Sequence, residues 1–250
     1  MQRQVDACPA KNRSEVSVLP AFFLIFVVDF LQKPMDQYDI AVKDKDGTTY
    51  YRYINDRKEL EVVRGDYSGT VNILESMTID GVTLPVTGIG AWAFRNCQDL
   101  HAVTVPYGVT SIGEQAFSGC VGLTAIDLPD SVRRIGIGAF SGCSGLTAMT
   151  IPGGLTSIEI GAFHHCSNLI SVVIPDGVTS IGSGAFSECR RLVSVTIPDS
   201  VTSIGIGAFY GCRGLTSVAL PAGLTHIGNY AFEGCNEVLV SRKVILESKK

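Results

Sequence analysis

Charged residues are scarce in this chain, where they make up 18% of 250 residues, against roughly 25% in an ordinary soluble domain. Lysine is missing altogether from residues 67–235. That stretch holds six arginines and eleven acidic residues, a net charge of −5. A nucleic-acid-binding protein needs a basic stripe along one face. The composition therefore argues against nucleic acid as a partner.

The chain also lacks the cysteine spacings that hold zinc, because no C-x-x-C pair and no Cys/His pattern of the zinc type occurs. Seven of its eight cysteines recur at one interval, at positions 97, 120, 143, 166, 189, 212 and 235. Side chains in equivalent positions of a repeat point in parallel directions, whereas a disulfide needs Cβ atoms about 3.8 Å apart with converging vectors. We expect a ladder of buried free thiols that behave as small apolar groups.

No group of residues in the sequence has the pattern of a catalytic site. A nucleophile needs a base and an orienting group at one place, whereas the serines, cysteines and histidines are spread along the chain by the repeat. The adjacent pair His164 and His165 has no matched carboxylates, and the G-I-G and G-S-G tripeptides recur as part of the repeat rather than as a phosphate loop. We expect no enzymatic activity, no cofactor and no metal.

The dominant feature that is present is a period of 23 residues. Phenylalanine occupies positions 94, 117, 140, 163, 186, 209 and 232, and proline positions 106, 129, 152, 175, 198 and 221. Self-similarity at a period of 20–29 residues is typical of solenoids, in which each repeat forms one coil and stacks on the next. The period predicts one elongated repeat domain rather than a compact globule.

One unit, which begins at Cys143, shows how a coil is built. Leu146, Met149 and Ile151 have the L-x-x-L-x-L spacing of a strand, and Pro152 ends that strand because it has no N–H to donate. A Gly-rich turn, a second apolar pair and the sequence Gly-Ala-Phe follow. Each coil offers six inward-facing apolar groups, here Leu146, Met149, Ile151, Leu155, Ile158 and Phe163. A single coil cannot bury them, so the coils must stack.

These motifs resemble the BspA-type leucine-rich-repeat family. The resemblance is carried by the L-x-x-L-x-L-P strand, the A-F-x-x-C corner and the V-T-S-I-G stretch, as at Val109–Gly113, Val178–Gly182 and Val201–Gly205. It implies a right-handed leucine-rich-repeat solenoid with a parallel β-sheet on the concave side and short irregular or helical segments on the convex side. It also implies display at a microbial surface and adhesion to host or matrix proteins, with no catalytic residues.

The sequence divides into four segments. Residues 1–37 form an apolar leader or anchor with a flexible extension, residues 38–66 an N-terminal capping hairpin, residues 67–240 a solenoid of about seven units, and residues 241–250 a tail. The hairpin is predicted from alternation over 49–54 and 60–63 around the turn at 55–58. A solenoid's first coil exposes an apolar face, so an atypical element is expected to cover it.

The apolar run at residues 16–31 has several interpretations. Its length suits the apolar part of an export signal, and it is short for a membrane span, which needs about 20 residues. Acidic residues flank it, and no clear cleavage site follows. An export signal, membrane attachment through residues 16–31, a docked helix and an extraneous extension all stay open.

Two groups of residues are candidates for partner binding. One group projects outward from the strands as a column of small residues, from which we select Thr150, Val173 and Thr196. The other lies at the corners after the phenylalanines and comprises Arg190, Arg191, Tyr210 and Arg213. The alternative is that both groups are simply the solvated surface of a low-charge array.

The sequence thus favours a secreted or cell-surface module, without enzymatic activity, that binds or adheres to proteins or glycans through its repeat array. The alternative is an intracellular or multidomain structural scaffold with no specific ligand of its own, in which case the protein is cytoplasmic.

Overall fold

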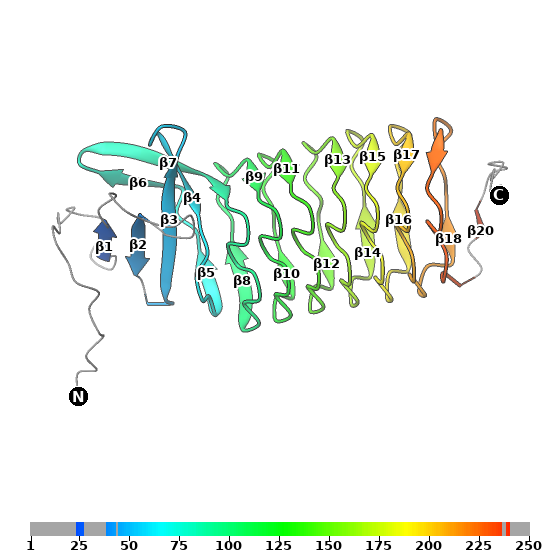
Figure 1. Cartoon of the computed structure of the whole chain (residues 1–250), viewed down its shortest axis with the longest axis horizontal. Helices are drawn as coiled ribbons and strands as arrows, with labels where there is room; N and C mark the ends of the chain where they lie inside the picture. Colours follow the sequence, from blue (N-terminus) through cyan, green and yellow to red (C-terminus); the bar gives the residue numbers. More distant parts are fainter. Residues whose placement is uncertain (1–23, 28–38, 44, 237–238, 241–250) are drawn as a thin grey trace.

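The chain forms a row of stacked coils that begins with a broader antiparallel region (Figure 1). The computed structural model describes residues 24–27, 39–43, 45–236 and 239–240, and these contain 20 strands and no helix. The predicted solenoid of about seven coils is confirmed. Within the described residues, no helix has the length and apolar character that crossing a membrane requires.

The N-terminal region is an antiparallel sheet of four strands, β1 (Leu24–Val27), β2 (Ile40–Lys43), β3 (Thr48–Ile54) and β4 (Glu59–Val62). The predicted hairpin is present as β3 and β4, with its turn at Asn55, Asp56 and Arg57, all of which have positive φ. Strand β4 then pairs in parallel with β7 (Val82–Ile89), which joins this region to the solenoid. The role of the hairpin as a cap stays a prediction.

Only four residues of the apolar run at 16–31 are described, and they form β1, which pairs with β2. For these four residues, the interpretation as a docked helix is therefore wrong. Apart from those four, residues 1–37 lie outside the described residues, and so does the tail at 241–250.

A second hairpin, which the sequence analysis did not predict, projects from the first unit. It joins β6 (Ser76–Ile79) to β7 through Asp80 and Gly81, whose φ angles are 51° and 78°. Positive φ at both central residues, with the sequence Asp-Gly, is characteristic of a type I′ turn, whose twist matches that of paired strands. The hairpin lies in a unit that departs from the period, since Pro85 comes 21 residues and not 23 before Pro106.

Each coil contributes two short strands, so the solenoid has two parallel sheets on opposite sides (Figure 1). The first sheet comprises β10 (Ala125–Ile126), β12 (Ala148–Met149), β14 (Ser171–Val173) and β16 (Ser194–Thr196). The second comprises β13 (Ser157–Ile158), β15 (Ser180–Ile181), β17 (Ser203–Ile204) and β19 (His226–Ile227). Further parallel pairs are β5 (Gly69–Asn72) with β8 (Leu100–Thr104), and β18 (Ser217–Val218) with β20 (Leu239–Val240).

The second sheet adds short strands to the segments that were expected to be irregular or helical, and within the described residues none of these segments is helical. The Thr-Ser-Ile stretches pair with one another at an interval of 23 residues, as Ser180 does with Ser203. β-Branched Thr and Ile favour extended backbone, and in β15, β17 and β19 the glycine after the Ile ends the strand. The corners that contain Phe and Cys are turns rather than helices.

The second sheet is interrupted once, between β11 (Arg134–Ile135) and β13. Strand β9 (Ser111–Ile112) pairs with β7, and β11 pairs with β9, but β11 and β13 belong to separate sheets. In most coils a glycine follows the strand of this second row. A Cβ added at Gly182 or Gly205 would lie 2.5–2.9 Å from backbone atoms of the preceding coil. The coil that contains β13 has Glu159 in that position, and a Cβ there requires a wider separation from the preceding coil.

The core is a continuous column of aromatic rings. The seven repeated phenylalanines stack with centroids 4.8–5.6 Å apart and planes within 8° of parallel. The widest separation, 5.6 Å, lies between Phe140 and Phe163, across the break at Glu159. Toward the N-terminal hairpin the column continues with Tyr67, whose ring lies 4.5 Å from that of Phe94. Trp92, two residues before Phe94, is 41% exposed.

The predicted thiol ladder runs beside this column. The seven repeated cysteines are free, and all but the half-buried Cys235 are buried. From Cys120 onward, each thiol donates a hydrogen bond to the carbonyl of the phenylalanine in the preceding coil, over 3.0–3.2 Å. The ladder therefore links each coil to its neighbour.

Candidate partner-binding surface

The first sheet presents one exposed column made of Thr150, Val173 and Thr196. Val173 pairs with Thr196 between β14 and β16, and the pairing of Ala148 with Ser171 sets Thr150 beside Val173. All three side chains are exposed, and Val173 is 65% exposed. The three strand residues selected from the sequence therefore lie together on an open face.

A neighbouring column contains two apolar residues that the sequence analysis did not select. Ile170 and Val193 are 43% and 53% exposed, and the N–H of Val193 donates to the carbonyl of Ile170 over 2.8 Å. Other coils carry threonine there, at Thr124, Thr147 and Thr216. The departure from threonine was a signal that could have identified both residues.

The arginines selected from the sequence lie at the corner that leads into this column. Arg190 and Arg191 come just before the buried Leu192 and the exposed Val193. The N–H of Gly214 donates to the carbonyl of Arg190 over 2.9 Å, which sets Arg213 and Arg190 at equivalent positions of adjacent coils. The basic corner and the apolar column thus form one surface. We name it the Arg–apolar patch, with the members Ile170, Val173, Val193, Arg190, Arg191 and Arg213.

One acidic residue lies within this corner. Glu188 accepts a hydrogen bond from Arg190 over 2.9 Å. This bond, together with the positive charge of Arg190, His165 and Arg213, lowers the pKa of the Glu188 carboxyl. Within the described part of the chain, neither Arg191 nor Arg213 forms an ion pair. The patch therefore keeps an excess of positive charge.

Tyr210, the fourth selected corner residue, lies directly after Phe209 and is 41% exposed. Its carbonyl accepts the N–H of Glu188 over 2.7 Å, so its backbone belongs to the same corner. Tyr210 is not counted as a member of the Arg–apolar patch.

The histidine pair has the geometry of two packed rings rather than of a ligand set. The rings of His164 and His165 lie 4.2 Å apart in an edge-to-face arrangement. Burial, with a smaller effect from His165, lowers the pKa of His164. In the described ranges, no three His, Cys, Asp or Glu side chains converge where a metal ion could bind.

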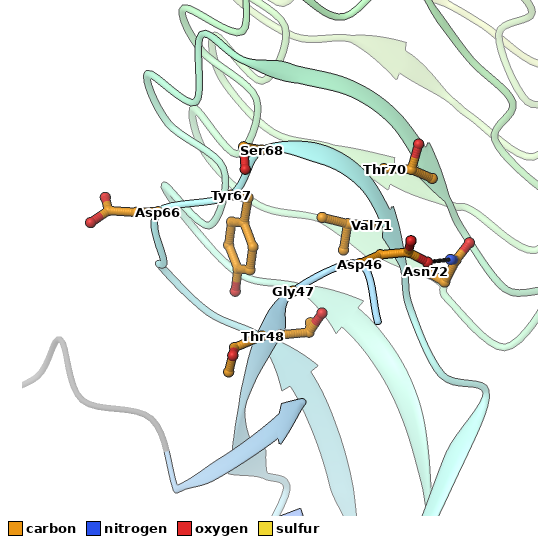
Figure 2. A pocket seen from close by; sticks show the side chains of 10 residues that line it. Asp46, Gly47, Thr48, Asp66, Tyr67, Ser68, Thr70, Val71 and Asn72 are labelled. Carbon is orange, nitrogen blue, oxygen red and sulfur yellow. Dashed lines mark hydrogen bonds between the residues drawn. The ribbon is translucent and has the colours of Figure 1, made fainter. Parts of the chain in front are cut away.

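A small polar pocket lies where the N-terminal region meets the solenoid (Figure 2). Its lining comes from β3 and β5 and from the residues just before each of these strands. It includes Asp46, Asp66, Ser68, Thr70 and Asn72. The volume is about 40 Å³, against roughly 300–1,000 Å³ for typical ligand pockets. Figure 2 shows Asp66 and Asp46 on opposite sides, so the two carboxylates do not form an acid–base pair.

Stacked coils with two short strands, a phenylalanine column and inward-facing Leu and Ile residues define a leucine-rich-repeat solenoid. The model of the BspA type leucine rich repeat region matches residues 71–193 and 156–244, with six copies. The chain belongs to this family. Leucine-rich-repeat proteins are generally non-enzymatic binding scaffolds that interact with proteins.

Solved structures agree with this assignment. A leucine rich cell surface protein from Faecalibacterium prausnitzii A2-165 is 34% identical, with a TM-score of 0.70 over 85% of this chain and 56% of that one. A leucine-rich repeat protein from Bacteroides ovatus ATCC 8483 is 36% identical, with a TM-score of 0.68 over 74% and 49%. The T. pallidum leucine-rich repeat protein is 37% identical, with a TM-score of 0.69 over 75% and 86%.

The chain therefore spans about half the length of the first two of these proteins. Among curated proteins, no match is found.

Proposed function

We propose that this chain is a non-enzymatic binding module, secreted or attached to the cell surface, that adheres to a protein or glycan partner through its repeat array. The observation that carries the proposal is the exposed first sheet, where Ile170, Val173 and Val193 stand open to solvent beside three arginines. Contiguous exposed apolar residues rimmed by polar ones mark interaction sites. The surface location is supported by the name of the F. prausnitzii protein, a cell surface protein.

The shape of the array favours a macromolecular partner over a small substrate. The first sheet is an extended face built from strands of two or three residues in successive coils. Stable protein interfaces need about 800 Å² on each partner, and an extended face suits such an interface better than a small pocket does. The described pocket is smaller than a typical substrate site.

Location is tested by protease treatment of intact cells, followed by immunoblotting for the chain. A surface protein loses its signal when protease is added outside the cells, while a cytoplasmic enzyme used as a control keeps its signal. Wholly protected protein in the cytosolic fraction would support the intracellular scaffold instead.

Binding is tested with the purified full chain on immobilised matrix proteins and glycan arrays. We expect saturable binding to at least one class of ligand. The matched control is the same chain after unfolding in urea, which lacks the assembled sheet. No binding to any surface would contradict the proposal.

A further inference from the structure

We infer that the Arg–apolar patch binds an extended protein segment whose acidic side chains lie beside apolar ones. This inference rests on the proposed binding function and assigns it a location and a partner chemistry. The partner's acidic groups face the corner with the three arginines, and its apolar groups cover Val173 of β14 together with Ile170 and Val193, which come just before β14 and β16.

The apolar half of the patch is local and specific to two coils. Ile170 and Val193 replace the threonine of other coils, and Val173 replaces the threonine found at 150 and 196. Their exposed fractions are 43%, 53% and 65%. Covering exposed apolar area stabilises a complex by roughly 25 cal/mol per Å² before the costs of association. The remaining columns of the first sheet offer small or hydroxylated residues, so the apolar gain is concentrated here.

The basic half of the patch stands out against an acidic array. Residues 67–235 carry a net charge of −5 with only six arginines, and three of those six lie at this corner. Glu188 is hydrogen-bonded to Arg190, so the charges of Arg191 and Arg213 are available to a partner. Arginine is enriched at the energetically dominant positions of protein interfaces. Carboxylates match its planar guanidinium through paired hydrogen bonds.

The acids at the far end of the same strands set the orientation of the partner. Asp176 and Asp199 are exposed in the turns that follow β14 and β16. The patch is therefore basic where the strands begin, apolar in the middle and acidic beyond the strands. The run from Arg190 to Thr196, of which only Ser194–Thr196 is strand, covers at most about 20 Å. An extended segment of about six residues fits this length with its carboxylates at the arginine end.

The repeat itself supplies variants that keep the fold. Ile170→Thr, Val173→Thr and Val193→Thr, made together, restore the residue of neighbouring coils. A second triple variant restores the corner residues of other coils, with the changes Arg190→Ser, Arg191→Gly and Arg213→Ser. Other coils have Ser144 and Ser167 at the position of Arg190 and Arg213, and Gly145 and Gly214 at the position of Arg191. Arg133→Thr with Arg134→Ser is the matched control, because it removes two arginines at β11, outside the Arg–apolar patch, by the same logic.

The probe is a fluorescein-labelled nine-residue peptide with three glutamates followed by alternating valine and threonine. Fluorescence anisotropy with the full chain measures its dissociation constant. A peptide with lysines in place of the glutamates is the comparison. We expect the acidic peptide to bind more tightly, and its affinity to fall between about 50 and 500 mM salt because salt screens the arginines. Each triple variant should weaken binding by about tenfold or more, and the control variant should leave it unchanged.

Three outcomes overturn the inference. The first is equal binding of the acidic and basic peptides. The second is an unchanged dissociation constant in both triple variants. The third is tight binding of a heparin fragment that needs the arginines but not the three apolar residues, which would assign the corner to an acidic glycan. If the triple variants still bind an immobilised matrix protein as the unmodified chain does, the general binding function stands and only this location is wrong.

Discussion

The thiol of Cys166 donates a hydrogen bond to the carbonyl oxygen of Phe140, 3.1 Å away in the preceding coil. The same carbonyl also accepts the N–H of Cys143 over 3.2 Å. Both of its acceptor positions are therefore used, one within the coil and one between coils. Because this arrangement recurs from Cys120 to Cys235, the two regular spacings of Phe and Cys are parts of one contact.

Replacing a ladder cysteine should destabilise the stack. Cys166→Ala removes the sulfur from a fully buried position and deletes one bond between coils. We expect the free energy of unfolding to fall by about 1–2 kcal/mol, measured by urea denaturation. Cys235→Ala, at the half-buried end of the ladder, is the control and should cost less. Equal losses would contradict the ladder's role.

Truncation of a ring in the phenylalanine column should cost most in the middle. Phe163 is 1% exposed and has ring neighbours on both sides, so Phe163→Ala should lower the free energy of unfolding by about 3–5 kcal/mol. Phe232 is only half-buried and stacks on Phe209 alone among the described rings. Phe232→Ala should cost clearly less in the same guanidinium titration, and a reversed order would count against the stacked column.

Stability should fall at alkaline pH because burial holds the thiols in their neutral form. Burial raises the pKa of Cys143 and Cys189 from the usual 9.0 to about 12. An unfolded chain ionises these thiols near pH 9, whereas the folded chain does not, so their contribution is complete below pH 9 and is lost as pH rises toward 12. Each thiol contributes a slope of up to about 1.4 kcal/mol per pH unit.

Denaturation curves between about pH 8 and pH 11 measure this slope. The double variant Cys143→Ala and Cys189→Ala, which has two fewer buried thiols, should show a shallower decline. An identical pH dependence in the variant would refute the assignment to these thiols.

The break in the second sheet should close when its cause is removed. Glu159→Gly takes away the Cβ that holds two coils apart, so we expect β11 to pair with β13 and the Phe140–Phe163 separation to shorten from 5.6 Å. Hydrogen exchange of the residue 159 amide should become slower. The converse change is Gly205→Ala, whose Cβ would lie 2.5 Å from the Ser183 nitrogen. It should cost about 3 kcal/mol.

Tyr67 tests the capping role of the N-terminal region. Its ring covers Phe94, and its hydroxyl donates to the Val63 carbonyl over 2.6 Å. Tyr67→Ala should lower the free energy of unfolding by about 3–5 kcal/mol, and Tyr67→Phe by about 1–2 kcal/mol through the lost hydrogen bond. Thermal unfolding followed by circular dichroism measures both. If Tyr67→Ala left stability unchanged, the capping role would be wrong.

Most of the solenoid could be predicted because its information repeats. A single Phe-x-x-Cys motif such as that at Phe94 and Cys97 indicates little, but seven copies at one period require equivalent positions in stacked coils. The buried ring column and the free thiols followed from that requirement alone. The outward column of Thr150, Val173 and Thr196 followed from strand alternation.

Other features depended on single departures from the repeat and were missed. The β6–β7 hairpin rests on one Asp-Gly pair, Asp80 and Gly81, inside a unit whose spacing differs. The break in the second sheet rests on Glu159. Ile170 and Val193 were not selected because they come just before β14 and β16, where strand alternation does not predict which side chains are exposed.

The amino-acid sequence by itself determined the coil length, the inward residues and the stacking, because the apolar residues that recur every 23 residues are buried only when the coils stack in register. The tertiary structure alone decided where coils separate and which surface residues meet. The arginines at 190, 191 and 213 and the apolar residues at 170, 173 and 193 become neighbours only when backbone pairing sets the coils in register. That register is a property of contacts between coils, which no single repeat contains.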